Sequence, residues 1–221
     1  MKKLIIACTV AGLVFSIGAR SADADMTINF EGLDYTQVST GGNITPNLAS
    51  VLTNDFMSDG LLFGRAGVSA GVAVVRGPYA PSSGRQSVVA LDASGILRDY
   101  GSDDIYFSFV EPGMLTPGHT DYVSFTIGDG GGDLEEFQIR SYNYAGTVID
   151  TQNVSGTARF SVTIAKPGIH HVEVDYIGQL WGYSLDDMSF NTPVSTPTPG
   201  AIVLGSIGVG IVGWLIKRRT L

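Results

Sequence analysis

Cysteine and basic residues are scarce in this chain. The single cysteine, Cys8, lies in an apolar N-terminal run that we expect to be removed, so the remaining protein forms no disulfide. Residues 25–199 keep seven of the 13 Lys and Arg and twenty of the 21 Asp and Glu, which gives them a net charge of −13. Such a charge repels nucleic acid and anionic surfaces, so we expect no DNA or RNA partner.

The N-terminus has the three parts of a secretory signal peptide. Met1-Lys2-Lys3 is a positive n-region, residues 4–19 are an apolar h-region, and Ala22-Asp23-Ala24 supplies the small residues that signal peptidase reads. We therefore expect signal peptidase to cleave after Ala24. Residues 1–24 are then the signal peptide, and residues 25–190 are the exported domain.

The C-terminus predicts a membrane span. Residues 200–216 carry no charge over seventeen positions, which corresponds to roughly 25 Å of helix. Lys217, Arg218 and Arg219 follow, and the positive-inside rule places them, with the rest of residues 217–221, in the cytoplasm. Residues 191–199 form a Pro/Thr/Ser linker before the span.

This end of the chain resembles the PEP-CTERM sorting signal of Gram-negative-type bacteria. Its parts are Pro197-Thr198-Pro199, the glycine-rich apolar segment and the basic cluster of Lys217, Arg218 and Arg219. The resemblance implies an exosortase as processing partner, removal of the tail, and delivery to the cell surface or the extracellular polysaccharide matrix. Thr198 stands where the family usually has glutamate. The alternative is a permanent single-span membrane anchor.

Residues 25–190 alternate between apolar and polar side chains with period two, and Gly- and Pro-rich turns separate the alternating segments. No amphipathic helix interrupts the pattern. It predicts an all-β fold, a β-sandwich of nine or ten strands, with the jelly roll favoured at this size. Two stretches, IRSYNYAGTVIDT (139–151) and SLDDMSF (184–190), are similar to jelly-roll domains that often precede this tail. The expected strands lie around residues 26–30, 72–76, 88–91, 105–109, 123–127, 137–139, 160–164, 172–176 and 183–190.

Two patterns resemble catalytic or metal sites. Residues 67–71 read Gly-Val-Ser-Ala-Gly, but a β-rich segment follows where a nucleophile elbow needs a helix, so we expect a simple turn. In a strand after Pro167-Gly168, His170 shares the apolar side, while His171 shares the other side with Glu173 and Asp175. We expect a solvated sheet face there, with a metal-binding row as the alternative.

Acidic residues near both ends of the domain suggest calcium. One of Asp186 and Asp187 must lie near an apolar layer, where a carboxylate needs donors or a cation. Pairing of the first and last strands would bring Glu31 close to them. We predict a structural Ca²⁺ site at Glu31, Asp186 and Asp187, with hydrogen-bonded carboxylates as the alternative. The acidic loop GDGGGDLEE (128–136) invites a second calcium site, and a flexible hairpin loop is favoured over it.

Aromatic residues near turns suggest a glycan-binding surface. Trp181, Tyr183, Tyr142 and Tyr144 are candidates for stacking on sugar rings, and buried core aromatics are the alternative. The leading function is a non-enzymatic, surface-sorted β-sandwich associated with extracellular polysaccharide. The alternative is a secreted glycan-active enzyme, for which no facing carboxylate pair can be identified in the sequence.

Overall fold

The computed structural model describes residues 24–38, 42–76, 84–98, 103–178 and 182–195. Residues 1–23 of the predicted signal peptide, the sorting signal at Pro197, Thr198, Pro199, Lys217, Arg218 and Arg219, and Trp181 lie outside these residues. None of the helices within the described ranges is both long and apolar enough to cross a membrane.

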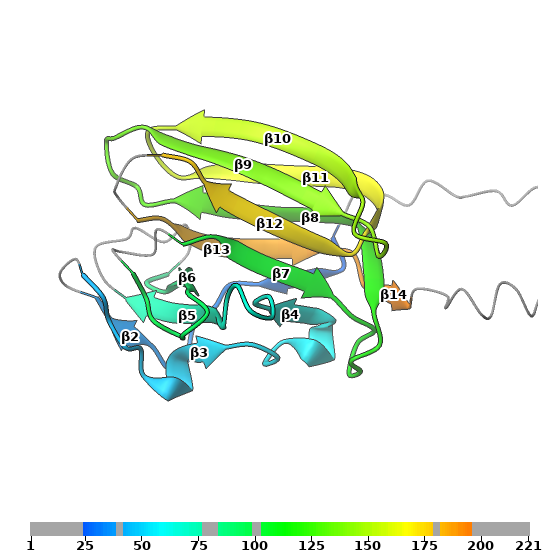
Figure 1. The fold of residues 1–221 in the computed structure, drawn as a ribbon, viewed down its shortest axis with the longest axis horizontal. Helices are drawn as coiled ribbons and strands as arrows, with labels where there is room; N and C mark the ends of the chain where they lie inside the picture. Colours follow the sequence, from blue (N-terminus) through cyan, green and yellow to red (C-terminus); the bar gives the residue numbers. More distant parts are fainter. Residues whose placement is uncertain (1–23, 39–41, 77–83, 99–102, 179–181, 196–221) are drawn as a thin grey trace, which may run out of the picture.

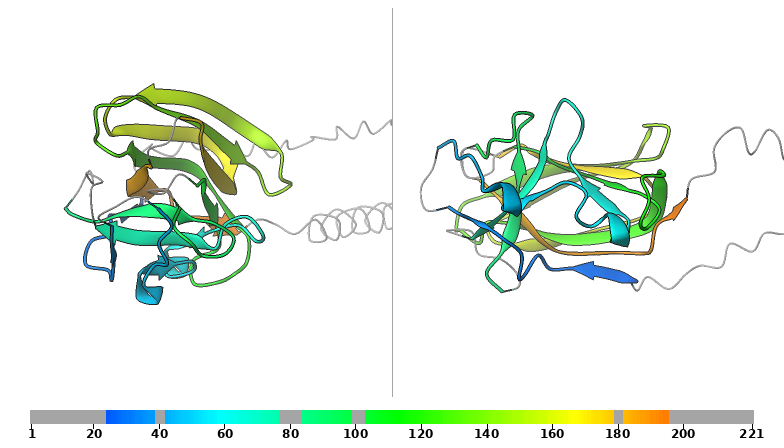
Figure 2. Two further views of the ribbon diagram at one scale, coloured as in Figure 1. Left: turned by 60° about the vertical axis from the view of Figure 1, so that its left-hand side comes forward. Right: turned by 90° about the horizontal axis from the view of Figure 1, so that it is seen from below.

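Two β-sheets face each other, which confirms the predicted all-β sandwich (Figures 1 and 2). Two 3₁₀-helices, η1 (Leu48–Ser50) and η2 (Met57–Asp59), are the helical elements in the described part of the chain. The larger sheet has the order β11 (Phe160–Ile169), β8 (Gly118–Gly128), β13 (Ser184–Phe190), β6 (Ser87–Leu91), β5 (Gly71–Arg76) and β2 (Thr36–Gln37), with β1 (Met26–Ile28) on β13, β14 (Val194–Ser195) on β8 and β3 (Val51–Leu52) on β5. The smaller sheet has the order β10 (Val148–Gly156), β9 (Glu135–Tyr142), β12 (His171–Tyr176), β7 (Ile105–Phe109) and β4 (Leu61–Phe63).

The core between the sheets follows from the period-two pattern. Apolar residues of β7, β8, β9, β11 and β12 point inward, and phenylalanines fill the centre. The Phe107 ring makes edge contacts with Phe63, Phe109 and Phe125 at centroid distances of 6.3, 6.0 and 5.7 Å. Edge-to-face packing of this kind adds to the stabilisation from burial alone.

A second, smaller core lies on the other side of β5 and β6. Val75, Val89 and Leu91 pack there with Val38 and Leu97. Strands that are covered on both faces have continuous apolar sequences, which explains the apolar runs VAVV in β5 and VVAL in β6.

A β-bulge in β13 changes the expected alternation. Asp187 has φ of 46°, and the register with β8 shifts between Asp186 and Ser189. As a result Leu185 and Met188 both lie in the core, although strict alternation would put them on opposite faces. Asp186 is fully buried and Asp187 only partly, so the expected carboxylate near an apolar layer is Asp186.

The sandwich extends past the boundary that we predicted at residue 190. The Asn191 side-chain amide donates to Asp121 at 2.6 Å, and the backbone carbonyl of Asn191 accepts from the Thr120 hydroxyl at 3.0 Å. Val194 then pairs with His119 in β14. The first residues of the predicted linker 191–199 therefore belong to the domain, because polar backbone contacts hold them where the sequence shows no apolar pattern.

Candidate functional site

The outer face of the smaller sheet carries a group of interacting polar and aromatic side chains. Strand register brings them together: Glu173 of β12 lies between Tyr106 of β7 and Arg140 of β9, and His171 pairs with Tyr142. Val172 and Val174 point into the core, so alternation turns His171 and Glu173 outward, as we predicted.

Glu173 is the centre of this group and is only 6% exposed. Its carboxylate accepts hydrogen bonds from the Tyr142 hydroxyl at 2.6 Å and the Tyr106 hydroxyl at 3.2 Å, and it pairs with Arg140 at 3.0 Å. Burial alone would raise the pKa of Glu173, but these hydrogen bonds and the Arg140 charge outweigh it and lower the pKa. Our expectation of a solvated sheet face is therefore wrong at Glu173, whose carboxylate is buried and ionised.

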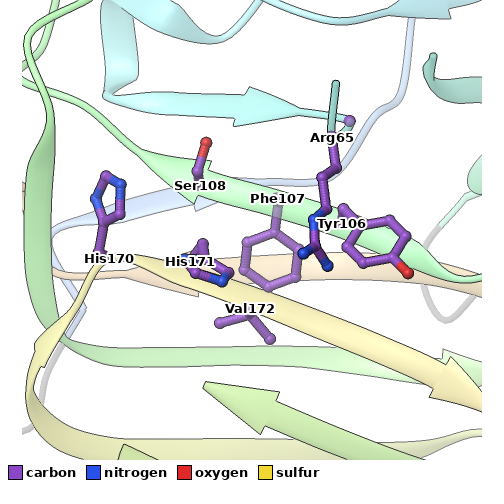
Figure 3. A pocket seen from close by; sticks show the side chains of 8 residues that line it. Arg65, Tyr106, Phe107, Ser108, His170, His171 and Val172 are labelled. Carbon is purple, nitrogen blue, oxygen red and sulfur yellow. The ribbon is translucent and has the colours of Figure 1, made fainter. Parts of the chain in front are cut away.

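A hollow of about 200 Å³ opens beside this group (Figure 3). Its lining comes from β7, from the start of β12 and from the segment before β5. The exposed Arg65 lies over the Tyr106 ring, with its guanidinium carbon 5.4 Å from the ring centroid. The hollow thus brings aromatic rings, a cation and polar groups together. The lining residues are Gly64, Arg65, Tyr106, Phe107, Ser108, His170, His171 and Val172.

Stacked rings continue from the hollow toward the β9–β10 turn. Tyr142 and His171 are parallel at 4.2 Å, and Tyr144, which is 49% exposed, contacts the His170 ring edge-on at 5.3 Å. Burial, followed by the charges of His170 and Arg65, lowers the pKa of His171 to about 4. His171 is therefore neutral at physiological pH. Two of the four predicted ligand-binding aromatics, Tyr142 and Tyr144, adjoin this hollow.

Asp104 borders the same group through Tyr106, whose hydroxyl donates to it at 3.1 Å. Burial, followed by the charge of Asp175, raises the pKa of Asp104 to about 6. A carboxyl group whose pKa is raised in the folded state favours folding at pH values below its unfolded-state pKa, which is 3.8 for Asp104. This contribution to stability is lost as the pH rises through the folded-state pKa of about 6.

We expect Asp104→Asn to stabilise the protein by about 1 kcal/mol above pH 7, where the native carboxylate is ionised. Thermal unfolding at pH 4 and pH 8 measures this. At pH 4 the two proteins should unfold at nearly the same temperature, because the native carboxyl is then largely protonated. A gain of the same size at both values of pH would contradict the assignment.

The residues of the predicted calcium site have other contacts. The first and last long strands are neighbours as expected, since β1 pairs with β13. Glu31, however, accepts hydrogen bonds from the backbone N–H groups of Arg85 and Gln86, both at 2.8 Å. Asp186 lies within electrostatic range of the half-buried Arg159. A calcium site at Glu31, Asp186 and Asp187 stays a prediction.

Two other sequence features are placed in structural roles. Tyr183 is fully buried, and its ring packs on Phe137 at 4.9 Å, so its prediction as a sugar-stacking residue is wrong. The signal in the sequence was its alternation with Leu185, which is also buried. Ser69 of the Gly-x-Ser-x-Gly pattern lies in a turn before β5, where its hydroxyl bonds to the Gly71 carbonyl at 3.1 Å, as the turn interpretation requires.

Five residues of this site carry no sequence pattern that groups them: Arg65, Tyr106, Arg140, Asp104 and Glu173. They come from three strands and the loops beside them, and only the strand register makes them neighbours. The sequence does indicate one part of the site, since His171, Glu173 and Asp175 form a polar row on one side of β12.

No family model matches the chain, and no curated protein matches it. Several solved structures are similar to it. The CBM22-1 xylan-binding domain of Paenibacillus barcinonensis Xyn10C is 13% identical with a TM-score of 0.38, over 80% of this chain and 99% of that chain. The C-terminal family 22 carbohydrate binding module of Clostridium thermocellum Xyn10B is 13% identical with a TM-score of 0.37, over 69% and 100%. The K2 cleaved adhesin domain of Lys-gingipain is 14% identical with a TM-score of 0.37, over 75% and 98%. Likeness at this level carries no inference about what this chain binds.

Proposed function

We propose that this protein is a non-enzymatic, surface-sorted β-sandwich that binds neutral polysaccharide on the outer face of the smaller sheet. The observation that carries the proposal is the hollow between Arg65, Tyr106 and His171, with Tyr142 and Tyr144 beside it. Aromatic rings stack on the apolar faces of sugars, and the surrounding polar groups hydrogen-bond to hydroxyls. The net charge of −13 on residues 25–199 favours a neutral glycan over an acidic one.

Affinity electrophoresis of the full chain through xylan, mannan and hydroxyethyl cellulose tests this function. We expect retardation by at least one of them. Arg65→Ala and Tyr144→Ala should weaken binding about tenfold, which corresponds to about 1.4 kcal/mol. The exposed residues Arg85 and Tyr35, just before β6 and β2 of the other sheet, supply matched controls, and Arg85→Ala and Tyr35→Ala should bind as the native protein does. Equal loss in site and control variants would contradict the proposal.

A second candidate is a glycan-active enzyme, which one observation favours. Asp104 and Glu173 share the single proton of the Tyr106 hydroxyl, with carboxylate oxygens 3.1 and 3.2 Å from the hydroxyl oxygen, and their surroundings move their pKa values in opposite directions. Paired carboxyl groups of this kind perform acid and base steps in glycosidases. Release of reducing ends from xylan or mannan, lost in the folded Asp104→Asn variant, would favour the enzyme. Binding without turnover favours the binding protein.

We further propose that the sandwich is a jelly roll, and that an exosortase removes the tail and leaves the domain in the extracellular matrix. The chain passes repeatedly from one sheet to the other, which supports the jelly roll. The Pro-x-Pro element, apolar segment and basic cluster at residues 197–219 support the processing. The intact mass of the protein from its producing cells tests it. A mass that ends near Pro197-Thr198-Pro199 is expected, and a mass that includes Leu221, confined to the membrane fraction, would instead indicate an anchor.

A further inference from the structure

The chain crosses between the two sheets at the end of the sandwich where β8 stops and β9 begins, at the left of Figure 1. Gly128 ends β8 beside Ser184, and Glu135 opens β9 opposite Gly156 of β10. Arg159, from the turn between β10 and β11, donates to the Ser184 hydroxyl at the same end. The β8–β9 loop is therefore held between two sheets and a neighbouring turn.

Three carboxylates gather in this loop. One oxygen each of Asp129, Asp133 and Glu135 lies within 4.8 Å of the others. Gly131 lies between them: a Cβ built there would fall 2.7 Å from an oxygen of Asp133 and 2.8 Å from an oxygen of Asp129. A β-carbon at this position would require at least one of the two carboxylates to move away, so the glycine leaves room for them to converge.

Glu135 is the unusual member of the group. It shares the inner side of β9 with Phe137 and Ile139 and is 1% exposed. Both of its carboxylate oxygens are buried and accept no hydrogen bond from the described residues. Arg159 does not supply one, because its Nε and Nη1 are also buried without a partner. An ionised carboxylate in that position is strongly destabilising unless a cation or donor satisfies it.

We propose that Asp129, Asp133 and Glu135 bind one calcium ion that fastens the β8–β9 loop to the end of the sandwich. The donor set is all oxygen, which selects a hard cation over zinc or copper. Three carboxylates carry three negative charges and up to six oxygens, and backbone carbonyls or water complete the shell that calcium prefers. This site is separate from Glu31, whose carboxylate accepts from two backbone N–H groups.

A proton is the competing occupant. Burial, followed by the charges of Asp129 and Asp133, raises the pKa of Glu135 to about 8. Calcium and a proton therefore compete for this carboxylate. Metal affinity that rises with pH is the general consequence of such competition.

Thermal unfolding of the full chain in detergent, with chelator or with added calcium, tests the site. At a calcium concentration about 100 times the dissociation constant, we expect the Tm to rise by about 5–10 °C relative to chelator. Glu135→Gln keeps the shape of the side chain and removes its charge, and it should lose most of this shift. Glu136 is the exposed neighbour on the other side of β9, so Glu136→Gln is the matched control and should keep the shift.

Three results would overturn the proposal. They are an unchanged native Tm between chelator and about 10 mM calcium, a Glu135→Gln shift equal to the native one, and an equal response to magnesium. If Glu135→Gln does not fold, Asp133→Asn replaces it, because Asp133 is exposed and its substitution leaves the core intact. Retention of the full shift in Asp133→Asn would then count against the site.

Discussion

Glu173→Ala should destabilise the domain by about 2–4 kcal/mol at pH 7 and lower its Tm by about 5–15 °C. The substitution leaves the hydroxyls of Tyr106 and Tyr142 without their buried acceptor and removes one of the two carboxylates that pair with Arg140. Unpaired polar groups at a site that is only 6% exposed are destabilising, because little water can replace the lost partner. Thermal or urea unfolding of the two proteins measures the difference.

Asp175→Ala is the matched control. Asp175 also pairs with Arg140, at 2.9 Å, but its side chain is 26% exposed and water can take its place. Its loss should lower the free energy of unfolding by less than about 1 kcal/mol. Equal effects of the two substitutions would show that Glu173 is not the centre of the network.

The effect of Glu173→Ala should also depend on pH. The folded-state pKa of Glu173 is lowered, so its contribution is present above the unfolded value near 4.5 and is lost as pH falls through the folded value. The difference in stability between Glu173→Ala and the native protein should therefore shrink below about pH 4. A difference that stays constant between pH 7 and pH 3 would mean that packing, and not the charge, is responsible.

The strands were predictable from the sequence because their signal is local. Alternation alone placed the strand around residues 105–109 and the strand around residues 172–176, with the correct side of each facing the core. Short strands such as β2 and β14 have two residues each and carry no period. The bulge at Asp187 depends on its backbone φ and its register with β8, which alternation cannot express.

The candidate site was predictable only in part, since it depends on contacts between strands. The row of His171, Glu173 and Asp175 was visible along one strand. The groups that convert it into a buried network, Tyr106 and Arg140, lie 67 residues before and 33 residues before Glu173. Pairing over such distances follows from the sheet order, and many sheet orders are compatible with the same alternation.

Tyr183→Ala should destabilise the domain far more than Tyr144→Ala or Tyr35→Ala, because the latter two side chains are exposed. The Tyr183 ring is fully buried between Phe137, at 4.9 Å, and Tyr176, at 5.3 Å. Truncation of a buried aromatic side chain costs about 3–5 kcal/mol through the cavity that it leaves. The Tyr183 hydroxyl also accepts from the Ile105 backbone N–H at 3.1 Å, and loss of a buried acceptor adds about 1–3 kcal/mol. Such a sum approaches the whole stability of many domains, so a large unfolded fraction is expected at 37 °C.

Tyr183→Phe separates the hydroxyl from the ring. It keeps the aromatic packing and removes the acceptor for Ile105 together with a donor within 3.1 Å of the Val174 carbonyl, so we expect a loss of about 1–3 kcal/mol in urea unfolding. Its retardation in polysaccharide gels should equal that of the native protein, because a ring inside the core cannot reach a ligand. Loss of glycan binding by Tyr183→Phe with unchanged stability would contradict this assignment. It would mean that the Tyr183 hydroxyl contacts the sugar and that the sandwich opens beside β13 when the protein binds glycan.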